Sequence, residues 1–216
     1  MSALAQFWWS WGVQLAVAVG TLAAATVALR LHVKFFPPVL RLIFAKPEGR
    51  PTPVALHTMQ DGAVVSTRIE RGRYYHVELK NERPLIPATN PIVYLLAVEV
   101  PDAAGSSFSE VWAGALPIVA TYYEVHPSKI LGADPQLYDL CSVVRGKWVE
   151  LHPQIQTMDF PKLWRYEGKT IRFRVTLQAR SLEVLSPRYV FEIAWDGEWV
   201  EDATEMRRHM VVKQIG

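Results

Sequence analysis

Residues 11–29 read WGVQLAVAVGTLAAATVAL, and this stretch decides the architecture of the chain. No charged side chain occurs before Arg30. A helix rises about 1.5 Å per residue, and the hydrocarbon core of a bilayer is roughly 30 Å thick, so about 20 apolar residues are enough to cross it. The sequence therefore predicts an N-terminal tail and a single transmembrane helix over residues 1–36, ended by Pro37 and Pro38.

Basic residues gather on the C-terminal side of this predicted helix. Glu48 is the one acidic residue among the first five cations, which are Arg30, Lys34, Arg41, Lys46 and Arg50. Because flanking Lys and Arg stay on the cytoplasmic side, we expect the N-terminus outside the cell (inner) membrane and the large C-terminal domain in the cytoplasm. The residues expected at the two membrane interfaces are Trp8, Trp9, Trp11, Arg30, Lys34 and Arg41.

A cleaved secretory signal, processed near the small residues 23–25, is the alternative. Such a signal has a basic N-terminal region and a short apolar core. Here the N-terminal side chains carry no charge and the apolar run is long, which favours a retained anchor. The single cysteine, Cys141, agrees with a reducing compartment, since secreted domains of this size often carry disulfides.

Small residues recur at every fourth position of the predicted helix. A spacing of four keeps residues on nearly one helix face, and small residues there let a second membrane helix approach closely. An alanine-rich helix also produces such a stripe by chance. We expect a helix-packing face, on other transmembrane subunits or on a second copy of this chain, made of Gly12, Ala16, Gly20, Ala24 and Ala28.

Residues 37–52 join the anchor to the rest of the chain. They are predicted to be an interfacial segment followed by a linker, because three prolines fall within seven residues, 47–53. The apolar stretch 39–44 leaves two interpretations open. It lies in the membrane interface with Arg41 reaching the phosphates, or it is the first strand of the soluble domain.

Residues 53–216 are predicted to form one cytoplasmic β-sandwich domain. Apolar and polar residues alternate over 75–80, 171–178 and 189–195, which is typical of strands with one buried face. Turn residues separate these runs, and Asp196-Gly197 favours a tight hairpin. The pattern resembles immunoglobulin-like modules, with a small β-barrel as the alternative. A short C-terminal helix, capped at Asp202, is expected before the last residues.

No motif for catalysis, cofactor binding or metal binding is present. The histidines lack metal-ligand spacing, and His126, Cys141 and His152 would form a site only if folding brought them together. The arginines at 68, 71 and 73 are interpreted as a solvated sheet face. Because these motifs are missing, we expect no catalytic residue, no cofactor and no metal. The formal net charge of only +2 does not favour a nucleic acid partner, and none is expected.

The expected function is therefore that of a non-catalytic, single-pass subunit, whose partners are the lipid bilayer and other membrane proteins. Such a subunit would stabilise or help assemble a larger complex, for example a photosynthetic or respiratory assembly. This layout resembles the H subunit of photosynthetic reaction centres, which has one span and a cytoplasmic β-rich domain. The alternative is a membrane-tethered sensor or effector, with a small-molecule ligand bound by the β-domain.

Overall fold

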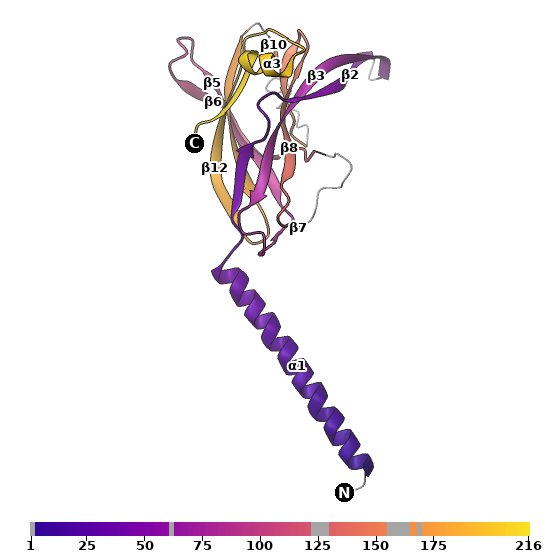
Figure 1. Ribbon diagram of the computed structural model, residues 1–216. Helices are drawn as coiled ribbons and strands as arrows, with labels where there is room; N and C mark the ends of the chain where they lie inside the picture. Colours follow the sequence, from indigo (N-terminus) through magenta and orange to yellow (C-terminus); the bar gives the residue numbers. More distant parts are fainter. Residues whose placement is uncertain (1–2, 61–62, 122–129, 155–164, 168–169) are drawn as a thin grey trace.

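The computed structural model describes residues 3–60, 63–121, 130–154, 165–167 and 170–216, which form one long helix and a β-rich body (Figure 1). Helix α1 (Ala3–Phe35) leaves one end of this body, and α3 (Ala203–His209) lies at the opposite end. The strands are β1 (Leu40–Phe44), β2 (Arg50–Gln60), β3 (Ala63–Asn81), β4 (Ala88–Thr89), β5 (Ile92–Pro101), β6 (Phe108–Pro117), β7 (Ile130–Leu131), β8 (Gln136–Val144), β9 (Trp148–Leu151), β10 (Arg165–Glu167), β11 (Ile171–Arg180), β12 (Leu185–Trp195) and β13 (Met210–Gln214).

The strands form two curled sheets and one short ladder. The first sheet has the order β1-β3-β8-β9-β10, with β2 also paired to β3. The second has the order β13-β12-β11-β5-β6, and β4 pairs with β7. Every pairing of named strands is antiparallel. The prediction of a mainly β chain behind one apolar helix is therefore confirmed.

The two sheets share one core, because the period-two pattern turns alternate side chains inward. On β3, Tyr75, Val77 and Leu79 are fully buried. On β11, Phe173 and Val175 are buried in the same hydrophobic cluster. The strand predictions made from alternation are thus confirmed at these positions, and apolar burial from two facing sheets stabilises the body.

One segment, residues 117–121, passes from the second sheet to the first. Its Ile118 amide donates to the carbonyl of Val93 on β5 at 2.9 Å. Its Val119 carbonyl accepts from the Asp139 amide on β8 at 2.8 Å, and its Thr121 amide donates to the Leu137 carbonyl. Backbone hydrogen bonds therefore join the two sheets along this side of the core.

The chain between α1 and the β-rich body contains more strand structure than its prolines suggest. Leu40 and Leu42 are buried in the core while Arg41 points outward, so 40–44 is the first strand and not an interfacial segment. Strand β2 then begins at Arg50. Residues 40–44 of the predicted interfacial segment and 50–52 of the predicted linker thus belong to the first sheet.

The two sequence predictions near the C-terminus have opposite outcomes. Asp202 caps α3, since its side chain accepts the Glu205 amide at 2.8 Å, and this helix is confirmed. The tight hairpin at Asp196-Gly197 is wrong. Gly197 has a positive φ of 93°, but β12 pairs with β13, with Trp195 opposite Met210. The turn leads into a loop and α3 because the partner strand lies farther along the chain.

Candidate functional site

Helix α1 is the longest described element, and its side chains from Trp11 to Ala28 take no part in the core of the β-rich body. It has 33 residues, and the window Trp11–Ala28 is long and apolar enough to span a membrane, with none of it buried. Extended apolar surface of this kind is rare on soluble proteins and marks a contact with lipid or protein. The hydroxyls of Thr21 and Thr26 donate to Val17 and Leu22 carbonyls at 2.8 Å, so these side chains are satisfied within the helix.

The predicted helix-packing stripe lies entirely on exposed positions. A Cβ added to Gly12 or Gly20 would meet no other atom within 4 Å. The glycines are therefore not required by contacts within the chain itself. The whole stripe, none of which packs on the body, is Gly12, Ala16, Gly20, Ala24 and Ala28.

The predicted interface residues divide between α1 and β1. Trp11 lies on α1 with 58% of its surface exposed. Arg41 lies on β1, where its guanidinium bonds Glu82 at 2.9 Å. The remaining four lie within α1, but their side chains are outside the described part of the structure: Trp8, Trp9, Arg30 and Lys34.

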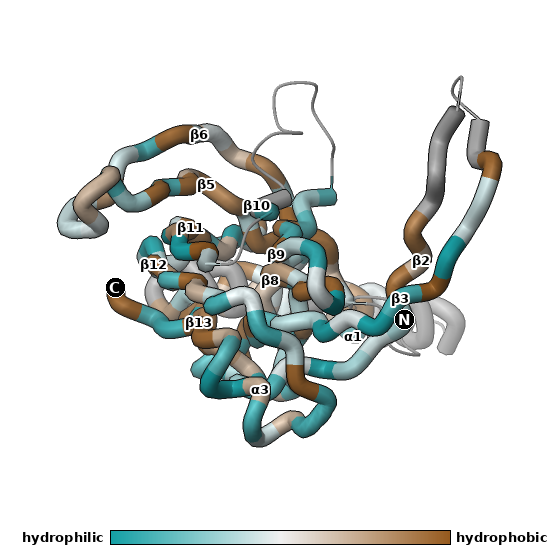
Figure 2. Tube along the Cα trace, turned by 90° about the horizontal axis from the view of Figure 1, so that it is seen from above, coloured by the Kyte–Doolittle hydropathy of each residue, from teal (hydrophilic) through white to brown (hydrophobic). Residues whose placement is uncertain are grey.

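Strands β2 and β3 extend beyond the first sheet as a two-stranded arm (Figures 1 and 2). Pairing of β3 with β8 begins only at Gly72. Gly72 is needed there, because a Cβ would lie 2.5 Å from Val54 Cγ2. In the arm, Val65 and Ile69 are 54% and 63% exposed. Unpaired strand edges and exposed apolar side chains make such an arm a template for contact with another chain.

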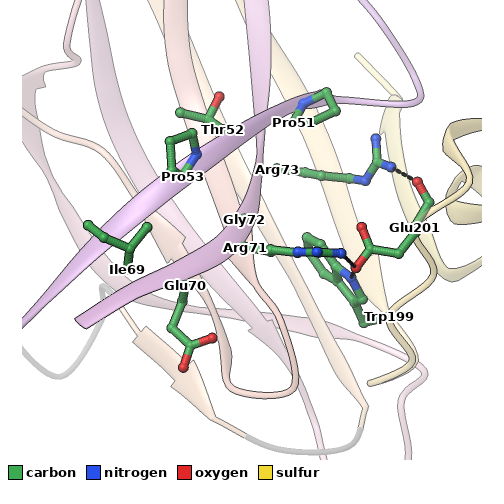
Figure 3. A pocket seen from close by; sticks show the side chains of 10 residues that line it. All are labelled: Pro51, Thr52, Pro53, Ile69, Glu70, Arg71, Gly72, Arg73, Trp199 and Glu201. Carbon is green, nitrogen blue, oxygen red and sulfur yellow. Dashed lines mark hydrogen bonds and ion pairs between the residues drawn. The ribbon is translucent and has the colours of Figure 1, made fainter.

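A groove of about 500 Å³ lies at the base of this arm, between β2, β3 and the loop before α3 (Figure 3). Arg73 is only 2% exposed, and its guanidinium donates to the carbonyls of Glu48 and Glu201. It also lies 5.9 Å from the Trp199 ring. No carboxylate pairs with it among the described residues, and its Nε is buried without a hydrogen-bond partner.

The Glu201 carboxylate balances only part of the positive charge at this groove. It accepts from Arg71 at 2.6 Å and lies 3.7 Å from Arg145. The Arg71 hydrogen bond lowers the pKa of Glu201. The groove is therefore lined by two guanidinium groups, Arg71 and Arg73, and by two carboxylates, Glu70 and Glu201. The prediction of a solvated arginine face is thus wrong for Arg73 and right for Arg71, which is exposed.

A second polar cluster lies on the outer face of the first sheet. His76 Nε2 is 3.1 Å from Asp139 Oδ1, and His152 Nε2 is 2.8 Å from the Ser142 hydroxyl. Tyr74 stacks on His152, with ring centroids 4.9 Å apart. Burial lowers the pKa of His152, so its ring is neutral at pH 7. Each histidine has its own partner, and the cluster does not form a Ser–His–Asp relay.

The hypothetical Cys–His site is not assembled by the described residues. Cys141 is fully buried in the core, and burial raises the pKa of its thiol. His152 bonds Ser142, which occupies the opposite face of β8. His126 lies outside the described residues. Within the described ranges, no three His, Cys, Asp or Glu side chains are placed to hold a metal ion.

Sequence reasoning missed the groove, although a signal for it exists. Position 73 has the same parity on β3 as the buried residues 75, 77 and 79, so the alternation places Arg73 on the core face. Its groove partners, Trp199 and Glu201, are more than 120 residues away, and no local pattern predicts that contact.

Comparison with protein-family models, with curated protein sequences and with solved structures finds no match to this chain.

Proposed function

We propose that this protein is a non-catalytic, single-pass membrane subunit that stabilises or helps assemble a larger membrane protein complex. The observation that carries the proposal is α1: all 18 residues from Trp11 to Ala28 are exposed. An apolar helix with 18 consecutive exposed residues has lipid and other helices as its natural contacts. The small-residue stripe supplies the face for a partner helix.

The β-rich body is the part that braces neighbouring subunits on the cytoplasmic side. The β2–β3 arm supports this role, because before Gly72 it pairs with no third described strand, and a two-stranded ribbon is marginal alone and gains from a partner. We further propose that the two curled sheets are arranged as an immunoglobulin-like sandwich. The shared core between two antiparallel sheets supports this arrangement.

The matched variants Gly20→Leu and Ala18→Leu test the helix contact. Two residues turn a helix by about 200°, so Ala18 lies almost opposite Gly20. Both residues are exposed and Gly20 has open space, so neither leucine clashes within the chain. We expect Gly20→Leu, but not Ala18→Leu, to reduce the larger assembly recovered by size-exclusion chromatography after mild detergent extraction. Equal recovery from both variants would contradict the proposed face.

The proposed orientation, with the domain in the cytoplasm, rests on the cations that follow the apolar run. Protease added to sealed, right-side-out cells is expected to leave the β-rich body intact. Digestion of the body in those cells would reverse the assigned topology.

The second candidate function is a membrane-tethered sensor that binds a small anion. The groove favours it, because Arg71 and Arg73 line it beside Glu70 and Glu201, and guanidinium forks bind carboxylate and phosphate well. The probe is inorganic phosphate, followed by the NMR signal of the Trp199 indole N–H. Saturable shifts that Arg71→Met abolishes would support the sensor, and absence of shifts would remove it.

A further inference from the structure

The end of the body that joins α1 carries large apolar side chains at its loop tips. Leu85, in the loop after β3, is 95% exposed. Leu182 and Leu185, at the turn between β11 and β12, are 74% and 56% exposed. A single exposed leucine is ordinary on a protein surface. Three at one end of the body, beside the helix that enters the membrane, indicate a common partner.

Hydrogen bonds fix both loops beside the exit of α1. The Glu82 amide donates to the Val39 carbonyl at 2.9 Å, and the Arg83 guanidinium donates to the Pro37 carbonyl at 3.2 Å. The loop that carries Leu85 is thereby joined to the short connection between α1 and β1.

The second loop is joined to the same end through residue 89. The Leu182 amide donates to the Thr89 carbonyl at 3.0 Å, and the Glu183 carboxylate accepts the Thr89 amide at 2.9 Å. The strand register agrees, since Arg180 on β11 lies opposite Ile92 at the start of β5. Both loops therefore stand at the end of the body from which α1 leaves (Figure 1).

The dimensions of α1 place this end at the lipid headgroups. From Trp11 to Arg30 the helix rises roughly 28 Å, close to the hydrocarbon thickness. Phe35 then lies about 8 Å farther on, within the headgroup layer. Only residues 36–39 separate α1 from β1, and four extended residues span at most about 14 Å. The loops beside this connection cannot move far from the membrane surface.

Charge at this end also suits a lipid surface. Arg83 and Arg180 are exposed near the leucine tips. Arginines beside apolar tips bind lipid phosphates while the apolar groups enter the interface. The nearby Glu82 is paired with Arg41 at 2.9 Å, which reduces its repulsion of anionic headgroups.

Resting on the membrane anchoring proposed above, we propose that Leu85, Leu182 and Leu185 form a second lipid contact. These side chains enter the headgroup region of the bilayer next to α1. The β-rich body is then held upright on the membrane, with the β2–β3 arm at a fixed height above it. The occupant of this surface is lipid, not a second protein.

The test uses full-length chain in vesicles and single labelled cysteines. Leu85→Cys and Leu182→Cys are each labelled with an environment-sensitive fluorophore, and Ile69→Cys on the arm is the control. Cys141 is fully buried, so unmodified chain is the labelling blank. We expect quenching by lipids with headgroup nitroxides for probes at 85 and 182, at least threefold stronger than at 69. Quenching at 85 and 182 no stronger than at 69 would overturn the lipid contact.

A fourth probe separates this inference from the anchoring itself. Leu15→Cys lies on α1, where Leu15 is 65% exposed, and deep acyl-chain nitroxides should quench it. Quenching at 15 without quenching at 85 and 182 refutes the second contact and leaves the anchor standing. No quenching at 15 refutes the anchor, and the second contact with it.

Discussion

Replacement of Arg73 by methionine tests whether a buried cation holds two distant loops on the first sheet. The guanidinium donates to the carbonyls of Glu48 and Glu201, which precede β2 and α3, and it lies over Trp199. Methionine keeps much of the side-chain volume but removes all of these interactions. We expect Arg73→Met to loosen both loops and destabilise the folded chain.

The size of the effect follows from the interactions that methionine removes and from the burial penalty that it relieves. Two hydrogen bonds from a charged donor contribute about 1.5–3 kcal/mol each, and the cation–π interaction with Trp199 adds about 0.5–2 kcal/mol. The buried Nε has no hydrogen-bond partner, so its removal relieves a desolvation penalty of about 1–3 kcal/mol and offsets part of this loss. The net destabilisation is about 2.5–5 kcal/mol, or roughly 5–20 °C in Tm for a chain of this size.

The assay is urea unfolding of the full chain in detergent micelles, followed by tryptophan fluorescence. The matched control is Arg68→Met on the same strand, where the arginine side chain is 77% exposed and pairs with Glu70. Exposed ion pairs contribute about 0–1 kcal/mol, so this variant should unfold almost as wild type does. Equal midpoints for Arg73→Met and Arg68→Met would refute the role of Arg73 as a clamp.

Three further predictions concern the core, the helix cap and the histidines. Phe173→Ala should lower the free energy of unfolding, measured in urea, by about 3–5 kcal/mol, because Phe173 is fully buried between the sheets. A decrease below about 1 kcal/mol would contradict that packing. Asp202→Ala should cost about 0.5–2 kcal/mol through loss of the α3 cap, whereas Asp202→Asn should recover most of it. The Asp196 hydrogen bond raises the pKa of His209 in the folded chain. The protonated His209–Asp196 pair therefore stabilises the fold fully below pH about 6.5, and this contribution is lost as the pH rises through the raised folded pKa. Burial lowers the pKa of His152 in the folded chain, so the pH dependence has the opposite sign. The free energy of unfolding is unaffected by His152 above pH about 6.5 and falls as the pH drops below that value. Imidazole NMR titration checks both directions, and reversed shifts would refute the two assigned environments.

Much of the β-rich body was predictable because burial is periodic along its strands. On β3 and β11 each second side chain points into the core, so residues such as Val77 and Phe173 indicate their strands in the sequence. The apolar helix was predictable for a similar reason, since its composition alone sets it apart. These features depend on local spacing, which a single sequence displays.

The features that were not predicted depend on contacts between distant residues. The sequence left β1 open between an interfacial segment and a first strand, because its partner Asn81 lies about 40 residues beyond Leu40. Asp196-Gly197 favoured a hairpin, but β12 pairs with β13 across α3. Arg73 appeared solvated because the loop that covers it is distant in sequence. The α1 stripe contacts nothing on the described part of the body, so its role in helix packing stays a prediction.

The attachment of the anchor to β1 has a mechanical consequence. Strand β1 runs away from the exit of α1 and is paired along its whole length with β3, from Leu40 opposite Asn81 to Phe44 opposite Val77. A force applied to α1 pulls β1 along its own axis, so all the β1–β3 backbone hydrogen bonds are loaded in shear at the same time. A force perpendicular to the strand would instead break these hydrogen bonds one after another from the end. If α1 lies in a membrane as proposed, its junction with β1 therefore resists force at the place where a moving membrane would apply it.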